Sequence, residues 1–223
     1  MAYRVEYSLK EGIMNTPTKI TFSRIIIIVL MLIALFVLSL TLDNAPLLGN
    51  TNINVVFLII FGVFVLASFT DFLDGYLARK NNQVTNLGKF LDPVADKLLI
   101  NSMVIFLACV QISAPYAANN LSFNLWCAII LIARDIVVDA LRFIGAQKQV
   151  VISANIFGKM KTVLEMIAIS LVLLNGFPFN YFDSTWQAGL HITDFVVYLT
   201  TLVSVISGII YVVQNRKVFI NKD

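Results

Sequence analysis

Four aspartates stand between two long apolar runs, in a segment that reads TDFLDGYLARKNNQVTNLGKFLDPVADKLL from residue 70 to residue 99. Asp71 and Asp74 are three positions apart, and Asp92 and Asp96 are four positions apart. On an α-helix, either spacing places the two side chains on one face. Two antiparallel helices that each carry one pair would bring all four carboxylates together. Carboxylate oxygens suit Mg²⁺ and Mn²⁺, so the pattern predicts a site where two such cations meet a phosphate.

The residues around the aspartates strengthen this prediction. A single Asp-x-x-Asp at a helix end is usually a solvated interfacial pair and would not by itself indicate a metal. The chain, however, reads D-G-x-x-A-R from Asp74 to Arg79 and G-x-x-x-D-x-x-x-D from Gly88 to Asp96. Glycine lets a ligand approach the backbone closely, and arginine can present a planar fork to a phosphate. The whole pattern therefore favours a ligand site over a solvated helix end.

The elements that must position these acids are strongly apolar. The chain has 223 residues, of which 59% are hydrophobic and 13% charged. A soluble domain carries about 25% charged residues, and a membrane-spanning helix needs about 20 predominantly apolar residues. Six segments approach this length, namely 25–42, 54–74, 90–112, 121–143, 162–174 (extended back to Gly158) and 195–213. We therefore expect an all-α integral membrane protein with six transmembrane helices.

The chain reads as one membrane domain with short ends. Residues 14–25 predict a short N-terminal interfacial helix that leads into the first span. We expect a six-helix catalytic domain over residues 14–216, a cytoplasmic tail over 217–223, and an extension of unassigned role over 1–13. Two cysteines lie in apolar runs without metal-ligand spacing, which indicates small buried hydrophobic residues.

The basic residues are confined to alternate connections. All 16 lysines and arginines precede the first segment, lie at or between the second and third or the fourth and fifth, or follow the sixth. The loops around 43–53, 113–120 and 175–194 have none. By the positive-inside rule, both termini and the aspartates are expected on the cytoplasmic side.

The aspartate segment resembles the signature of the CDP-alcohol phosphotransferase family at every fixed position. The resemblance implies a membrane enzyme with six transmembrane helices, usually a homodimer, which uses an alcohol to displace CMP from a CDP-linked substrate. It implies that Asp71, Asp74 and Asp92 bind metal, and that Asp96 is both a ligand of the second metal and the general base. It also implies a CDP site lined by Gly75, Ala78, Arg79 and Gly88.

A second charged cluster is expected to select the acceptor alcohol. The strings ARDIVVDALR and GKMKT place Arg134, Lys159 and Lys161 on the same side as the aspartates. Three cations there predict a pocket for an acceptor that carries its own phosphate. For the two lysines, the alternative is that they extend to anionic lipid headgroups. For Asp139 and Arg142 we expect only a surface ion pair between positions i and i+3.

The same strings, with the opening NTPTKITFSR, are similar to family members whose acceptor is sn-glycerol 3-phosphate. Thr18 stands where those enzymes usually have Asn, and Asp135 replaces the more usual Glu. The resemblance implies transfer of the phosphatidyl group from CDP-diacylglycerol to glycerol 3-phosphate, with release of CMP, at the cytoplasmic face of a bacterial inner membrane. We expect membrane lipids and a second copy of the chain as partners, and no nucleic acid.

Two other interpretations remain open at this stage. The shared core motif also fits a cardiolipin, phosphatidylserine or phosphatidylinositol-phosphate synthase. From a different class, a small ion transporter could use intramembrane acids. A transporter would place its acids near the bilayer midplane on broken helices, whereas these acids cluster toward one interface.

Overall fold

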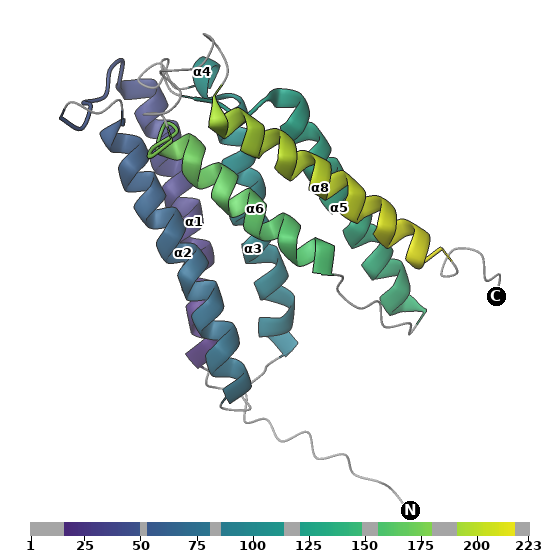
Figure 1. The fold of residues 1–223 in the computed structure, drawn as a ribbon. Helices are drawn as coiled ribbons and strands as arrows, with labels where there is room; N and C mark the ends of the chain where they lie inside the picture. The colour runs from purple at the N-terminus through teal and green to yellow at the C-terminus, as the bar shows by residue number, and fades with distance from the viewer. Residues whose placement is uncertain are drawn as a thin grey trace, which may run out of the picture.

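The computed structural model describes residues 16–49, 53–80, 86–113, 121–148, 156–179 and 191–216, with the backbone alone at residues 16–17, 72–79, 86–90 and 112–113. Its long helices are α1 (Thr16–Thr41), α2 (Val55–Lys80), α3 (Asn86–Ala108), α5 (Leu125–Gln147), α6 (Ile156–Leu173) and α8 (Ile192–Gln214). One short helix, α4 (Val110–Ser113), follows α3 (Figure 1). Within the described residues, extended pairing is limited to one isolated bridge between Leu47 and Asn54. The expected all-α class is confirmed.

Each of the six expected apolar segments overlaps one long helix. Two helical stretches, Thr18–Thr41 and Ile192–Gln214, are long and apolar enough to cross a membrane, and Val55–Asp71 is a shorter apolar stretch. The helices α3, α5 and α6 contain the charged clusters, which lowers their mean hydropathy. Six spans therefore remain a prediction, although all six helices are present.

The N-terminal interfacial helix expected over residues 14–25 does not form a separate element. Helix α1 runs without interruption from Thr16 to Thr41. Pro17 lies in its first turn, where the missing N–H would have no helical partner in any case. No other proline and no glycine follows in the helix to break it. Residues 16–24 of the opening string are therefore the first part of α1.

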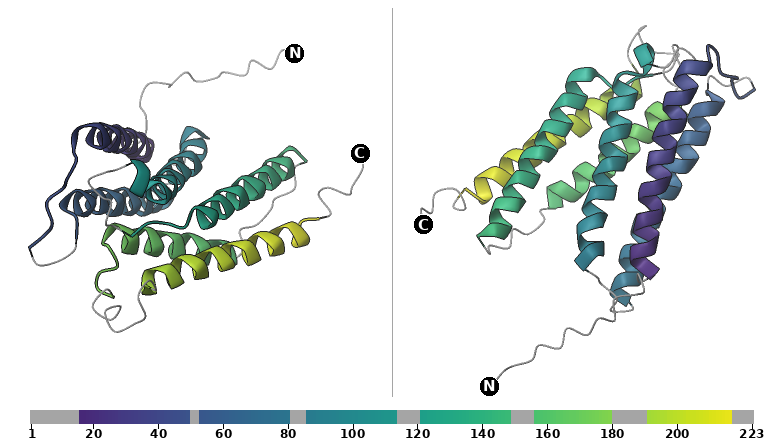
Figure 2. Two further views of the ribbon diagram at one scale, coloured as in Figure 1. Left: turned by 90° about the horizontal axis from the view of Figure 1, so that it is seen from above. Right: turned by 180° about the vertical axis from the view of Figure 1, so that it is seen from behind.

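Helix α3 lies between two groups of helices. On one side it packs against α1 and α2, and on the other against α5 and α6, while α8 packs on α5 and α6. Figures 1 and 2 show this arrangement, with the end of α2, the start of α3, the end of α5, the start of α6 and the end of α8 on the same side of the bundle. That side carries both charged clusters. The position of α3 lets its side chains face both groups.

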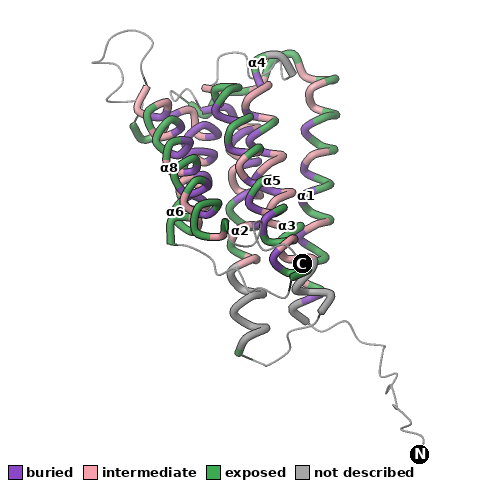
Figure 3. Tube along the Cα trace, turned by 90° about the vertical axis from the view of Figure 1, so that its right-hand side faces the viewer, coloured by how far each residue is buried: buried purple, intermediate pink, exposed green. Residues whose placement is uncertain are grey.

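The interior and the outer surface are both apolar. Buried residues of α2, α3, α5 and α6 form one continuous core that includes Phe57, Phe64, Met103, Leu131 and Ile169. Exposed positions follow the outward sides of the helices (Figure 3). Many of these are large and apolar, for example Phe36 and Leu40 on α1 and Phe195 on α8. Exposed apolar surface of this extent fits contact with lipid.

Candidate active site

Helices α2 and α3 bring the predicted metal ligands to one end of the bundle. An open cavity of about 900 Å³ is lined by Asp71 of α2 and by Asp92 and Asp96 of α3, together with residues of α5. Asp74 lies near the end of α2, among residues for which only the backbone is described. The same holds for the predicted CDP-binding residues, which are Gly75, Ala78, Arg79 and Gly88. Three of the four predicted metal ligands therefore share one cavity.

The first part of α1 holds two of these carboxylates. Arg24 is only 1% exposed and forms an ion pair with Asp71. Thr21 donates a hydrogen bond of 2.8 Å to Oδ1 of Asp92. Sequence reasoning did not assign a role to either α1 residue. The signal in the sequence that could have pointed to them is their three-residue spacing, which puts both side chains on one face of α1.

The donor set at this cavity fits a hard divalent cation. All predicted ligands are carboxylates, and oxygen ligands suit Mg²⁺ or Mn²⁺. Among the described side chains, which leave out Asp74, no three His, Cys, Asp or Glu residues are close enough to hold one ion. A complete site would therefore draw on Asp74 as well. The assignment of these four aspartates as ligands remains a prediction.

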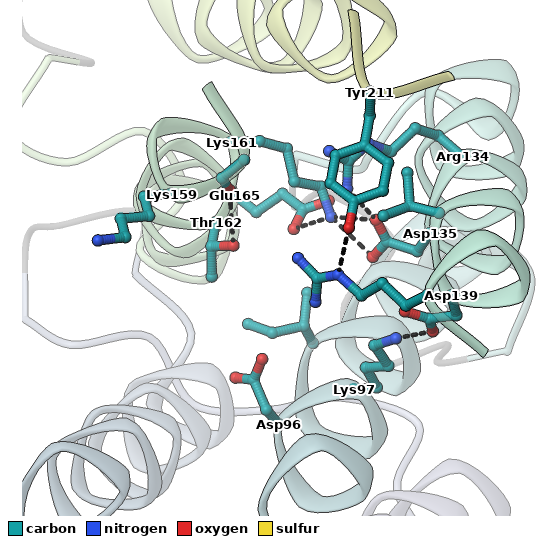
Figure 4. A pocket seen from close by; sticks show the side chains of 14 residues that line it. Asp96, Lys97, Arg134, Asp135, Asp139, Lys159, Lys161, Thr162, Glu165 and Tyr211 are labelled. Atoms are coloured by element: carbon teal, nitrogen blue, oxygen red, sulfur yellow. Dashed lines mark hydrogen bonds and ion pairs between the residues drawn. The ribbon is translucent and has the colours of Figure 1, made fainter. Parts of the chain in front are cut away.

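A second, smaller cavity of about 200 Å³ lies between α3, α5, α6 and α8 (Figure 4). Its walls are unusually rich in charge. The cations are Lys97, Arg134, Arg142, Lys159 and Lys161, and the acids are Asp96, Asp135, Asp139 and Glu165. The three residues predicted to bind the acceptor phosphate, Arg134, Lys159 and Lys161, all line it.

Four of these side chains form a buried charge cluster, made of Arg134, Asp135, Lys161 and Glu165. Lys161 is 3% exposed, and its Nζ lies 2.7 and 2.8 Å from the two oxygens of Asp135 and 2.5 Å from Oε2 of Glu165. Arg134 donates to Asp135 at 3.0 Å and to Oγ of Ser207 at 2.7 Å. The charge cluster contains two cations and two acids, so its formal charge is zero.

Helix α8 makes room for Arg134. A Cβ atom added to Gly208 would lie 2.9 Å from Cγ of Arg134, which is closer than real Cβ atoms approach a neighbour. The next residue along the chain toward the N-terminus, Ser207, accepts the hydrogen bond from Arg134. Gly208 therefore permits the close approach that places Arg134 in the cavity wall.

The expected surface ion pair between Asp139 and Arg142 is wrong. Asp139 instead pairs with Lys97 of α3, and Nε of Arg142 donates to the phenol oxygen of Tyr211 at 2.9 Å. Helix α5 packs against both α3 and α8. Two positions three residues apart differ by about 60° around a helix, so each side chain meets a different neighbouring helix.

The two predicted lysines differ in their surroundings. The burial of Lys161 in the charge cluster excludes the alternative that it extends to lipid headgroups. Lys159 is exposed, and in Figure 4 its ammonium group points away from the charge cluster. For Lys159 both the acceptor role and the headgroup role remain predictions.

The two cavities meet at Asp96. Four residues line both of them, namely Asp96, Lys97, Asp139 and Arg142. A carboxylate at this boundary can reach a group bound on the aspartate side and a group bound in the smaller charged cavity. This geometry suits a group transfer between two ligands, with Asp96 as the proton acceptor.

Comparison with known proteins agrees with this geometry. The family model for CDP-alcohol phosphatidyltransferase matches residues 14–212. The chain belongs to the CDP-alcohol phosphatidyltransferase family. The resemblance seen in the aspartate segment is thereby confirmed. Because the members of this family are transferases, the chain is an enzyme, and the transporter interpretation is excluded. The family generally depends on divalent cations.

Three bacterial relatives named CDP-diacylglycerol–glycerol-3-phosphate 3-phosphatidyltransferase cover nearly the whole chain. The protein of Bacillus subtilis is 37% identical over 202 residues, which is 90% of this chain and 95% of the relative. That of Mycoplasma pneumoniae is 37% identical over 223 residues, covering 96% and 92%. That of Rickettsia felis is 32% identical over 207 residues, covering 92% and 97%. The similarity thus extends over both charged clusters.

Replacing Lys161 by Met is expected to destabilise this transferase by about 3–5 kcal/mol. The buried carboxylate of Glu165 would lose its cation, and Asp135 would keep only Arg134. Thermal unfolding in detergent measures the loss. Lys159→Met is the matched control, since substitutions at exposed positions usually change stability by about 0.5 kcal/mol or less. Adding Glu165→Gln to Lys161→Met should restore part of the stability. Equal melting temperatures for the two single variants would contradict the burial argument.

Proposed function

We propose that the chain transfers the phosphatidyl group of CDP-diacylglycerol to sn-glycerol 3-phosphate, which yields CMP and phosphatidylglycerol phosphate. The observation that carries the proposal is the position of Asp96 at the boundary between the aspartate cavity and the charged cavity. The names of the three relatives support the choice of donor and acceptor. The reaction joins a lipid diphosphate, held on one side, to a small phosphorylated alcohol held on the other.

The aspartate cavity holds the donor in this proposal. Two divalent cations, Mg²⁺ or Mn²⁺, would be held by Asp71, Asp74, Asp92 and Asp96 and would neutralise the diphosphate charge. Arg24 and Thr21 fix the orientation of the first and third of these carboxylates. The cytidine diphosphate would lie along the end of α2 and the start of α3, against Gly75, Ala78, Arg79 and Gly88.

The charged cavity holds the acceptor. Asp96 takes the proton from the primary hydroxyl of glycerol 3-phosphate, and the hydroxyl oxygen forms a bond to the phosphorus nearer the lipid. The bond from that phosphorus to the CMP oxygen breaks, and CMP leaves with the electron pair. Arg134, Lys159 and Lys161 are proposed to bind the acceptor phosphate. Because three carboxylate oxygens already surround the Lys161 ammonium, a phosphate must compete with them there.

An acceptor panel tests this assignment. Purified protein with CDP-diacylglycerol and Mg²⁺ should release CMP in the presence of glycerol 3-phosphate. Glycerol, serine, inositol 1-phosphate and phosphatidylglycerol should support little release at the same concentration. Efficient turnover with one of these four, and not with glycerol 3-phosphate, would move the chain to another branch of the family.

The proposal includes six transmembrane helices with both termini in the cytoplasm of a bacterial cell. Residues 14–216 form the catalytic unit in this proposal, and the protein acts as a homodimer. Light scattering in detergent measures the mass of the assembly. In a variant without Cys109 and Cys127, an impermeant thiol reagent outside intact cells should label a cysteine at Asn44 and spare one at Lys148. Both positions are exposed. Asn44 follows the end of α1 and Lys148 follows the end of α5, and these two helix ends lie at opposite ends of the bundle (Figure 1). Labelling of the Lys148 position alone would reverse the orientation.

A further inference from the structure

The charges that line the smaller cavity are largely paired with one another. Lys97 pairs with Asp139, and the charge cluster balances Arg134 and Lys161 with two acids. These pairs account for three of the five lining cations. A dianionic phosphate is attracted most strongly to cations whose charge is not already neutralised. The two that remain are Lys159 and Arg142, both of which are exposed.

Arg142 is held at the boundary of both cavities by a neutral partner. Its Nε donates to the phenol oxygen of Tyr211 at 2.9 Å, and its guanidinium carbon lies 5.5 Å from the centre of the Tyr211 ring. Within the part of the chain that the structure describes, no carboxylate forms an ion pair with Arg142. Its full positive charge is therefore available to a ligand.

Tyr211 is itself rigidly placed. It is only 2% exposed, and its ring packs with Val138 and Leu141 of α5. These two residues precede Arg142 by four positions and one position, so the phenol lies over the turn of α5 that leads to Arg142. The hydrogen bond uses Nε and leaves the two terminal nitrogens of the guanidinium. Those two nitrogens form the fork that binds phosphate oxygens in pairs.

We propose that Arg142, oriented by Tyr211, binds the phosphate of the acceptor. This inference rests on the proposed function, and it adds to the acceptor site a residue for which the sequence predicted only a surface ion pair. Tyr211 lines only the smaller cavity, so its bond to Nε keeps the guanidinium at that cavity. Asp96 lines the same cavity. A short phosphorylated alcohol can then place its phosphate on Arg142 and its hydroxyl on Asp96.

The test compares three variants, Arg142→Gln, Arg142→Lys and Tyr211→Phe, with the control Arg216→Gln. Arg216 is an exposed cation just after α8, and it lines neither cavity. Loss of a charge-assisted bond to the phosphate should raise the KM for glycerol 3-phosphate by about 10- to 100-fold in Arg142→Gln. Arg142→Lys keeps a charge but loses the fork and should give a smaller rise of roughly threefold to tenfold. Tyr211→Phe should raise the KM for glycerol 3-phosphate by a similar factor, because only the hydrogen bond that orients Arg142 is lost.

The second measurement needs no turnover. Glycerol 3-phosphate and inorganic phosphate should each raise the melting temperature of the wild type and of Arg216→Gln, and should not raise that of Arg142→Gln. Unchanged thermal shifts in Arg142→Gln would overturn the inference. A rise in the KM for CDP-diacylglycerol in place of the acceptor KM would also overturn it, because Arg142 would then serve the donor. If the wild type prefers another acceptor in the panel, the proposed function fails, and the thermal shift with inorganic phosphate still decides the role of Arg142.

Discussion

Asp96→Asn is expected to lower the rate of CMP release by about 10²- to 10⁴-fold, the usual contribution of a positioned general base. The substitution keeps the size of the side chain and removes its ability to accept the hydroxyl proton. Of the three predicted metal ligands whose side chains the structure describes, only Asp96 also lines the smaller charged cavity. Its loss should therefore affect kcat more than the binding of either substrate. Initial rates at saturating substrate concentrations, with purified protein in detergent, measure the effect.

The control for this variant is Asp43→Asn, an exposed acid in the connection after α1, at the opposite end of the bundle. That variant should turn over at the wild-type rate. CDP-diacylglycerol should still raise the melting temperature of Asp96→Asn, which shows that the donor site is intact. More than a tenth of the wild-type rate in Asp96→Asn would mean that another group accepts the proton.

Removal of divalent cations is expected to abolish turnover. The four predicted ligands are all carboxylates, and without cations their charges would oppose the binding of a diphosphate. Treatment with EDTA should reduce CMP release to the background, and excess Mg²⁺ or Mn²⁺ should restore it. Asp92→Asn should raise the cation concentration required for half of the maximal rate. Because Thr21 can still donate a hydrogen bond to the Asn oxygen, that variant should keep its fold.

The chelation experiment has a direct contrary outcome. Full turnover in EDTA, with cation removal verified by elemental analysis, would exclude the two-cation mechanism. Restoration by Ca²⁺ to the same rate as Mg²⁺ would show that the site does not need the octahedral geometry of the smaller ion.

The helices were predictable because each has a strong local signal. Six apolar segments predicted the positions of six long helices. The places of Asp71 at the end of one helix and of Asp92 and Asp96 at the start of the next predicted that they would share one cavity. Pairing two antiparallel neighbours needs only a short connection, which the sequence makes evident. The interfacial helix expected over residues 14–25 is not a separate element, because polarity changes near Arg24 while helix propensity does not, and α1 therefore runs on from Thr16 to Thr41.

The partners of individual side chains were less predictable. Asp139 and Arg142 have a spacing that permits a local pair, but contacts with Lys97 and Tyr211 depend on how α3 and α8 pack against α5. The contacts of Thr21 and Arg24 likewise depend on the approach of α1 to α2 and α3. Such long-range contacts have no periodic signature in a single sequence, so they emerge only from the packed structure.

In the proposed reaction, two ligands meet at Asp96 and the phosphatidyl group passes from one to the other. The most direct measurement uses ¹³C-labelled glycerol 3-phosphate with CDP-diacylglycerol and Mg²⁺, followed by mass spectrometry of the lipids. Labelled phosphatidylglycerol phosphate is expected in amounts equal to the CMP released, and Asp96→Asn should form both products at a rate lower by about 10²- to 10⁴-fold. Release of CMP with unlabelled phosphatidic acid as the lipid product would contradict the proposed reaction, because water and not the bound alcohol would then be the acceptor.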